Sequence, residues 1–114
     1  MDVMEEDLKT IVKYLFRAIG RNWTIYCSGL DYNHKMKRFR FARIPIDVEM
    51  RLRYAYQAIL LVKEAYGKEA LREWMSKRNP NLNWKSPADT LRYSDNLRKL
   101  SQVIEAAQKF VVSC

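Results

Sequence analysis

The 114-residue chain has very few of the residues that build metal sites and disulfides. It contains a single histidine, His34, and two cysteines, Cys27 and Cys114, that lie far apart without Cys-x-x-Cys spacing. No carboxylate cluster accompanies His34 at the spacing of metal ligands. We therefore expect neither a metal centre nor a disulfide framework, and we expect no cofactor.

Membrane spans and catalytic motifs are also missing from the sequence. No apolar run approaches the roughly 20 residues of a membrane helix. The first residues are acidic, where a signal peptide would be basic. We find no Gly-rich phosphate loop, no nucleophile elbow and no paired His/Cys spacing. These absences predict a cytoplasmic protein that does not contact a membrane and is not an enzyme.

Hydrophobic periodicity and positive charge are what the sequence does have. The chain is 48% hydrophobic and 30% charged, which is ordinary for a globular protein of one domain. Lys and Arg number 21 against 13 Asp and Glu, which gives a net charge of +8. This surplus favours an acidic partner, either a nucleic acid or an acidic protein surface, although it would also simply keep the protein soluble.

The apolar spacing predicts a mainly α fold, a small helical domain of four to five helices. A first helix spans residues 5–19 and ends at Gly20, and a long one opens at Pro45 and closes at Gly67. A short helix follows and ends before Pro80. Ser86 is expected to cap the next helix, and Ser94 or Asp95 the last.

Residues 21–44 leave two interpretations open. Trp23–Cys27 is rich in β-branched and aromatic residues, and Arg38–Ile44 alternates basic and apolar residues. Together they would form a short β-hairpin within residues 23–44. Helices are the other interpretation. We therefore treat residues 1–44 as an N-terminal helix plus a basic and aromatic segment, and residues 45–114 as a helical part of the same compact unit.

The most specific pattern lies between Lys68 and Leu91, where a helical Trp is followed by Asn-Pro-x-Leu and then by x-Pro-x-Asp-x-Leu. It resembles the toxin-binding domain of the Xre/MbcA/ParS-type antitoxins over about residues 45–112. The chain departs from the family at Asn83-Trp84, where a Gly pair is usual. The matching residues are Ala70, Trp74, Asn79, Pro80, Leu82, Pro87, Asp89 and Leu91, with Arg51, Arg53 and Ala65-Tyr66-Gly67 upstream.

The resemblance implies a homodimeric antitoxin that binds and neutralises a cognate toxin enzyme, of the RES type, and that also regulates its own transcription through DNA. Residues 1–44 would then hold a shortened or degenerate helix-turn-helix. The expected partner-binding residues are Trp74, Asn79, Pro80, Leu82, Trp84 and Phe110. The phase of Trp74 with Leu71 and Met75 favours a place in the core, whereas Trp84 is as compatible with exposure as with burial.

The alternative is a nucleic-acid-binding or transcription-regulatory protein that uses the basic segment Lys35–Arg53. Its candidate contacts are Lys35, Lys37, Arg38, Arg40 and Arg43, interleaved with Phe39 and Phe41. Cations would bind the phosphate backbone while rings stack on bases. The simpler reading is that the two Phe side chains face the core and the cations form a solvated face.

Overall fold

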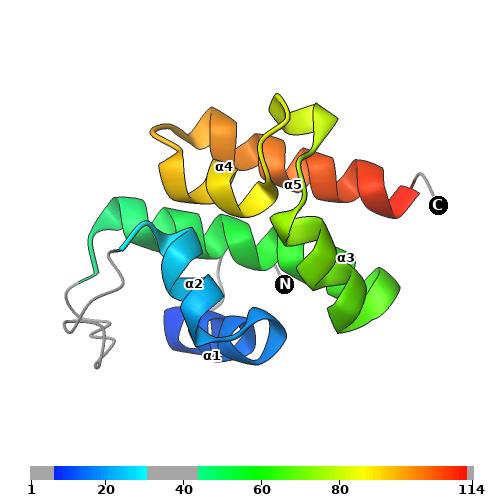
Figure 1. Cartoon of the computed structure of the whole chain (residues 1–114). Coiled ribbons are helices and arrows are strands. Elements are labelled where there is room, and N and C mark those ends of the chain that lie inside the picture. Colours follow the sequence, from blue (N-terminus) through cyan, green and yellow to red (C-terminus); the bar gives the residue numbers. More distant parts are fainter. Residues whose placement is uncertain (1–6, 31–43, 113–114) are drawn as a thin grey trace.

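The computed structural model describes residues 7–30 and 44–112, and these form helices without any strand (Figure 1). The mainly α fold of four to five helices is confirmed. An isolated antiparallel bridge joins Asn79 to Lys85. The elements are α1 (Leu8–Ile19), α2 (Arg21–Ser28), α3 (Ile46–Ser76), a 3-10 turn η4 (Pro80–Leu82), α4 (Pro87–Tyr93) and α5 (Leu97–Val112).

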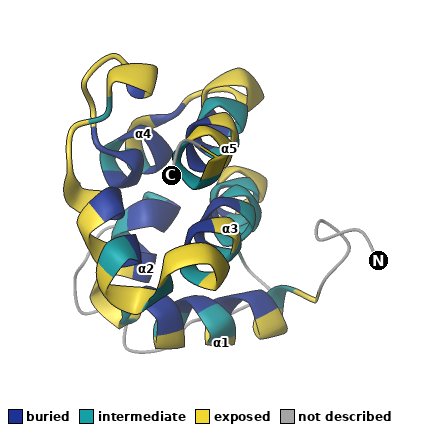
Figure 2. Ribbon diagram, turned by 90° about the vertical axis from the view of Figure 1, so that its right-hand side faces the viewer, coloured by how far each residue is buried: buried dark blue, intermediate teal, exposed yellow. Residues whose placement is uncertain are grey.

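The long helix α3 is the centre of the fold, with α1 and α2 on one side and α4 and α5 on the other (Figure 1). Leu52, Ile59 and Val62 of α3 are fully buried. Figure 2 shows the buried residues of the helices facing this shared interior. The apolar residues of α3 therefore pack against helices of the same chain on two sides.

Two glycines set the direction of the chain around α3. Gly20 separates α1 from α2 with φ 89°, as the sequence predicts for the end of the first helix. Gly67, the predicted end of the long helix, breaks the helical backbone with φ 88° and ψ 179°, so that α3 consists of two helical parts joined at a kink, as the sequence predicts. This backbone conformation is open almost only to glycine. The kink turns the last residues of α3 toward α5 and the loop that follows.

The caps of the last two helices were only partly predicted. The Ser86 hydroxyl accepts a hydrogen bond from the Asp89 N–H at 3.1 Å, and Pro87 takes the first helical position, as expected. The predicted cap of the last helix is wrong. The Asn96 side chain accepts from the Lys99 N–H at 2.9 Å, while the Ser94 hydroxyl donates back to Leu91. Asn96 directly precedes the first residue of α5 and lies three residues before Lys99, so its side-chain amide oxygen is positioned as in an N-cap.

Of the two interpretations of residues 23–27, the helix is right and the strand is wrong, because these residues lie in α2. Thr24, Ile25, Cys27 and Ser28 are all buried, and α2 packs against α1, α3 and α4. This burial outweighs the β propensity of the segment. The Thr24 hydroxyl bonds to the Gly20 carbonyl at 2.8 Å, inside the helix. The other arm of the predicted hairpin falls almost entirely outside the described residues.

Candidate partner-binding site

The loop between α3 and α4 is held closed by its own hydrogen bonds. The Asn79 side chain accepts from the Asn81 N–H at 2.8 Å, and the Asn79 carbonyl accepts from the Trp84 N–H at 2.9 Å. Asn79 also donates its N–H to the Lys85 carbonyl at 3.1 Å. These hydrogen bonds join the two ends of the loop and its first turn. Such a loop presents its side chains in fixed positions.

Asn83 and Trp84 both have left-handed backbone conformations, with φ 56° and φ 65°. These two positions are where the antitoxin pattern has a Gly pair, and glycine is the residue that adopts this conformation at least cost. Asn tolerates it well, whereas Trp adopts it rarely. The turn therefore has a backbone conformation that suits glycine, although the chain has Asn and Trp at these positions.

A pocket of about 330 Å³ lies between the end of α3, the start of η4 and the last turns of α5. We call it the Trp74 pocket. It brings together four of the six predicted partner-binding residues, Trp74, Asn79, Pro80 and Phe110, from three separate elements. Its full lining is Ala70, Glu73, Trp74, Lys77, Arg78, Asn79, Pro80 and Phe110.

The other two predicted partner-binding residues lie outside this pocket. Leu82 is 4% exposed and belongs to the hydrophobic core, so its side chain fixes the loop to the domain. Trp84 is 65% exposed, on the outer side of the loop. Only Trp84 of these two is available to a partner in the structure as it stands.

Trp74 is buried, as its helical phase predicts, with 5% of its surface exposed. Its ring lies 6.1 Å from that of Phe110, and the Phe110 ring meets Tyr66 edge to face at 5.2 Å. The Tyr66 hydroxyl donates to the Val111 carbonyl at 2.9 Å, which secures the end of α5. The indole nitrogen Nε1 of Trp74 is buried and has no hydrogen-bond partner among the described residues.

The rim of the Trp74 pocket is basic. Glu73 and Lys77 form an exposed ion pair, and the hydrogen bond and charge of Lys77 hold the pKa of Glu73 below its usual value. Arg78 is exposed and forms no ion pair with any other described residue. The pocket therefore combines an apolar floor with one uncompensated cation at its edge.

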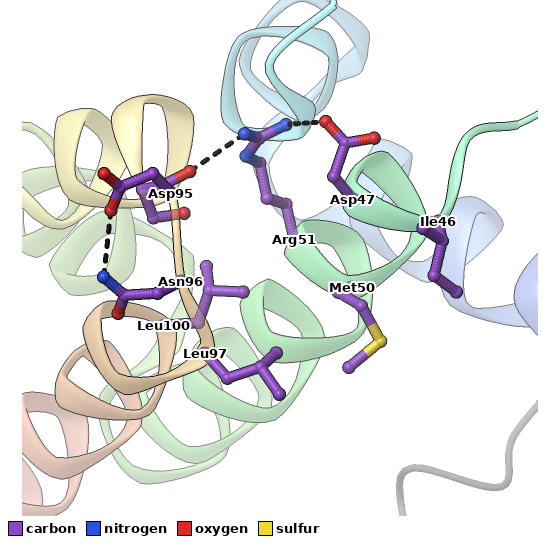
Figure 3. Close-up of a pocket in the computed structure, with 9 residues that line it drawn as sticks. Ile46, Asp47, Met50, Arg51, Asp95, Asn96, Leu97 and Leu100 are labelled. Carbon is purple, nitrogen blue, oxygen red and sulfur yellow. Dashed lines mark hydrogen bonds and ion pairs between the residues drawn. The ribbon is translucent and has the colours of Figure 1, made fainter.

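A second pocket, of about 430 Å³, lies between the start of α3 and the start of α5 (Figure 3). Arg51 is the central polar residue of its lining. The Arg51 guanidinium donates to the Ser94 carbonyl at 2.9 Å and to Asp47 at 3.2 Å, with a longer contact of 3.4 Å to the Ser28 carbonyl. It thereby connects α2, α3 and the end of α4, so its role is in the fold.

Arg92 makes a similar connection between α2 and α4. Its guanidinium donates to the carbonyls of Tyr26 and Leu30, each at 3.0 Å, and lies 4.7 Å above the Tyr26 ring. The Tyr26 hydroxyl donates to Asp89 at 2.5 Å, and this hydrogen bond raises the pKa of Tyr26 well above its usual value. Sequence reasoning named Arg51 only as a match to the antitoxin pattern and did not name Arg92, because the carbonyl partners of both arginines lie far away along the chain.

The predicted nucleic-acid contacts Lys35, Lys37, Arg38, Arg40 and Arg43 fall outside the described residues. A second group of cations, which the structure does describe, was expected only to form the solvated face of the first helix and was not proposed to contact nucleic acid. Lys9, Lys13 and Arg17 on α1 and Arg21 on α2 are exposed, and residues 8–30 contain no Asp or Glu. The signal was in the sequence, since the first three follow one another at four-residue intervals along one helix face.

The described residues contain no group of three potential metal ligands. Cys27 is fully buried, and burial raises the pKa of its thiol to about 12. None of the helices in the described ranges combines the length and apolar character needed to cross a bilayer.

Comparisons with family models, curated proteins and solved structures found no match. The likeness to the antitoxin family thus stays a prediction from the sequence.

Proposed function

We propose that this protein is antitoxin-like and binds and neutralises a partner toxin enzyme through the Trp74 pocket. One observation carries this proposal. Four of the six residues predicted to bind the partner line the same pocket, although they lie at the end of α3, at the start of η4 and on α5. Residues that only build a core would have no reason to meet at an opening in the surface.

The pocket has the properties of a protein-binding hot spot. Its floor presents Ala70, Pro80 and Phe110 beside the large Trp74 ring, and tryptophan is enriched at the centres of interfaces. The hydrogen-bonded loop is already fixed before binding, so less conformational entropy is lost on association. A toxin held at this pocket would also contact the exposed Trp84 and the end of α5.

Three further parts of this proposal rest on the resemblance alone: homodimerisation, a RES-type partner and autoregulation of transcription.

Ala70→Arg and Ala65→Arg are a matched pair of variants for testing this function. Both residues lie on α3, but only Ala70 lines the Trp74 pocket, and Ala65 is exposed. The candidate toxin is the product of the neighbouring reading frame. We expect Ala70→Arg to lose neutralisation of that enzyme in co-expressing cells, because a long cation fills the pocket, while Ala65→Arg protects as well as the native chain. A folded Ala70→Arg variant that still neutralises the enzyme would overturn the proposal.

Nucleic-acid binding is a second candidate, and the charge of the N-terminal helices favours it. Residues 8–30 carry four Lys or Arg and no acid. Trp23 on α2 is 38% exposed, so a ring is available for stacking near these cations. The candidate contacts Lys35–Arg43 that the sequence alone indicates stay a separate prediction, because they fall outside the described residues.

The salt dependence of binding to a fluorescent oligonucleotide tests this second candidate. The plot of log K against log salt has a negative slope for binding through phosphates. Removing two phosphate contacts with Lys13→Gln and Arg17→Gln should make this slope less steep by about 2. The control pair, Lys68→Gln and Arg72→Gln, removes two exposed cations from α3 and should leave the slope unchanged. Equal slopes for both pairs, or no binding at low salt, would exclude an interface on α1 and α2.

A further inference from the structure

The Trp74 pocket has a hydrogen-bond donor that the free protein does not use. Buried N–H groups in native proteins almost always have an acceptor. The Trp74 Nε1–H is the only polar group of its side chain, and it has none among the described residues. Trp74 also lines an open pocket, so another molecule could supply an acceptor if a neighbouring side chain shifted to uncover Nε1.

Two other buried polar atoms of the described residues also lack a partner, and their surroundings differ. Nε of Arg51 belongs to a guanidinium whose charge already faces Asp47 and two carbonyls. The Tyr14 hydroxyl lies between α1 and α3, beside the ring of Tyr56. Only at Trp74 does an unused donor coincide with an uncompensated cation, Arg78, in the lining of one pocket.

We propose that the Trp74 pocket binds a carboxylate that adjoins an apolar side chain, on an acidic segment of the partner protein. The apolar side chain would occupy the floor formed by Ala70, Pro80 and Phe110. One carboxylate oxygen would accept from the Trp74 N–H, and Arg78 would neutralise the charge. This inference rests on the proposed function and adds the chemistry that the partner must present.

The charges of the rim favour a carboxylate over a more highly charged group. Glu73 lies in the lining and is paired with Lys77, so only one cation of the pocket is left to compensate an incoming charge. A single negative charge matches it, and hydrogen bonds to an ionised acceptor are the stronger kind. The indole nitrogen is covered in the free protein, so we expect the Phe110 ring, in the last turn of α5, to shift when the ligand enters.

Spectra of the indole N–H groups of the full chain can test this chemistry without the natural partner. The chain has three Trp residues, so Trp23 and Trp84 serve as internal controls, and the Trp74 signal is assigned by its loss in Trp74→Phe. The probe is N-acetylphenylalanine, and its neutral match is N-acetylphenylalaninamide. We expect the acid to move the Trp74 signal downfield at millimolar concentration and to bind about tenfold more tightly than the amide.

Arg78→Gln should remove this preference, so that acid and amide bind alike, whereas Arg98→Gln, an exposed cation of α5 outside the pocket, should leave it intact. No shift of the Trp74 signal, or equal shifts with both probes in the native chain, would overturn the inference.

The proposed function and the proposed pocket chemistry can fail separately. If neither probe shifts the Trp74 signal while Ala70→Arg abolishes neutralisation, the proposed function stands and the carboxylate chemistry is wrong. If the acid binds while Ala70→Arg still neutralises the enzyme, the proposed function is wrong and the carboxylate chemistry stands.

Discussion

Two regions of this molecule bury polar groups in opposite ways. At the end of α2, which we call the α2 junction, Arg51 and Arg92 donate to the carbonyls of Tyr26, Ser28 and Leu30. In the Trp74 pocket, the one donor of a buried ring is left without an acceptor among the described residues. A satisfied buried group stabilises a fold, whereas an unsatisfied one at a surface opening is better explained by a ligand. At the junction only Nε of Arg51 lacks a partner among the residues that the structure describes, and the rest of the guanidinium is hydrogen-bonded, so the comparison indicates a structural role for the junction and supports the binding role proposed for the pocket.

The largest effect is expected at the α2 junction, for Arg51→Met. Methionine keeps much of the aliphatic bulk of the side chain but leaves the buried carbonyl of Ser94 without its donor at 2.9 Å. We expect a loss of about 3 kcal/mol in the free energy of unfolding, because a buried acceptor of a charged donor is left unpaired. Denaturant unfolding followed by circular dichroism measures it.

Arg78→Gln is the control for that measurement, since Arg78 is exposed and has no ion pair among the described residues. Its unfolding free energy should stay within about 0.5 kcal/mol of the native value. Similar losses for the two arginine variants would show that the α2 junction is not the anchor that the comparison requires.

Gly29→Ala should have the next largest effect, because Arg51 approaches Gly29 closely. A Cβ at Gly29 would lie 2.6 Å from Nη1 of Arg51, and the backbone there has φ 84°. Strain and displacement of the guanidinium together should cost about 2 kcal/mol. In the Arg51→Met background the clash is gone, so the cost should fall to about 1 kcal/mol. Strictly additive losses in this double-mutant cycle would contradict the contact.

The sequence was sufficient for the helices because their signals are local. Gly20, Pro45 and the Ser86-Pro87 cap act on their immediate neighbours, and the apolar spacing of α3 decides which face is buried. Segment 23–27 was left open between strand and helix because its β-branched residues fit either one, and only packing against three other helices decides between the two. Propensity alone does not contain that information.

The candidate site was only partly predictable for a related reason. The antitoxin pattern pointed to Trp74, Asn79 and Pro80, but it could not show that Leu82 turns into the core while Trp84 stays outside. The α2 junction was missed altogether. Its hydrogen bonds join Arg92 to residues 62 and 66 positions away, and no spacing rule links positions so far apart.

Tyr26→Phe tests a weaker part of the α2 junction, the hydrogen bond between the Tyr26 hydroxyl and Asp89. We expect a loss of about 1.5 kcal/mol at pH 7, the usual size for a hydrogen bond to a charged group. The bond raises the pKa of Tyr26 above its ordinary value of 10.0. Its contribution is therefore complete below pH 10 and is lost as the pH rises through the higher pKa of the folded state.

Urea titrations of both proteins from pH 7 to pH 11 follow this contribution. The difference between the native chain and Tyr26→Phe should be constant up to about pH 9 and should shrink above pH 10. Tyr14 and Cys27, whose pKa values burial raises to about 12, remain in both proteins and cancel in the difference. A difference that grows with pH would mean that the hydroxyl does not donate to Asp89.

Trp74→Phe should have the smallest effect on stability, although it removes part of a side chain that is only 5% exposed. Losing part of the indole ring weakens packing, but it also removes a buried donor that has no acceptor among the described residues, and the two terms oppose each other. We expect the free energy of unfolding to change by less than about 1 kcal/mol, and neutralisation of the partner enzyme to fall strongly. A loss as large as that of Arg51→Met would mean that the indole N–H stabilises the free fold, and the Trp74 pocket would then belong with the α2 junction as part of the fold.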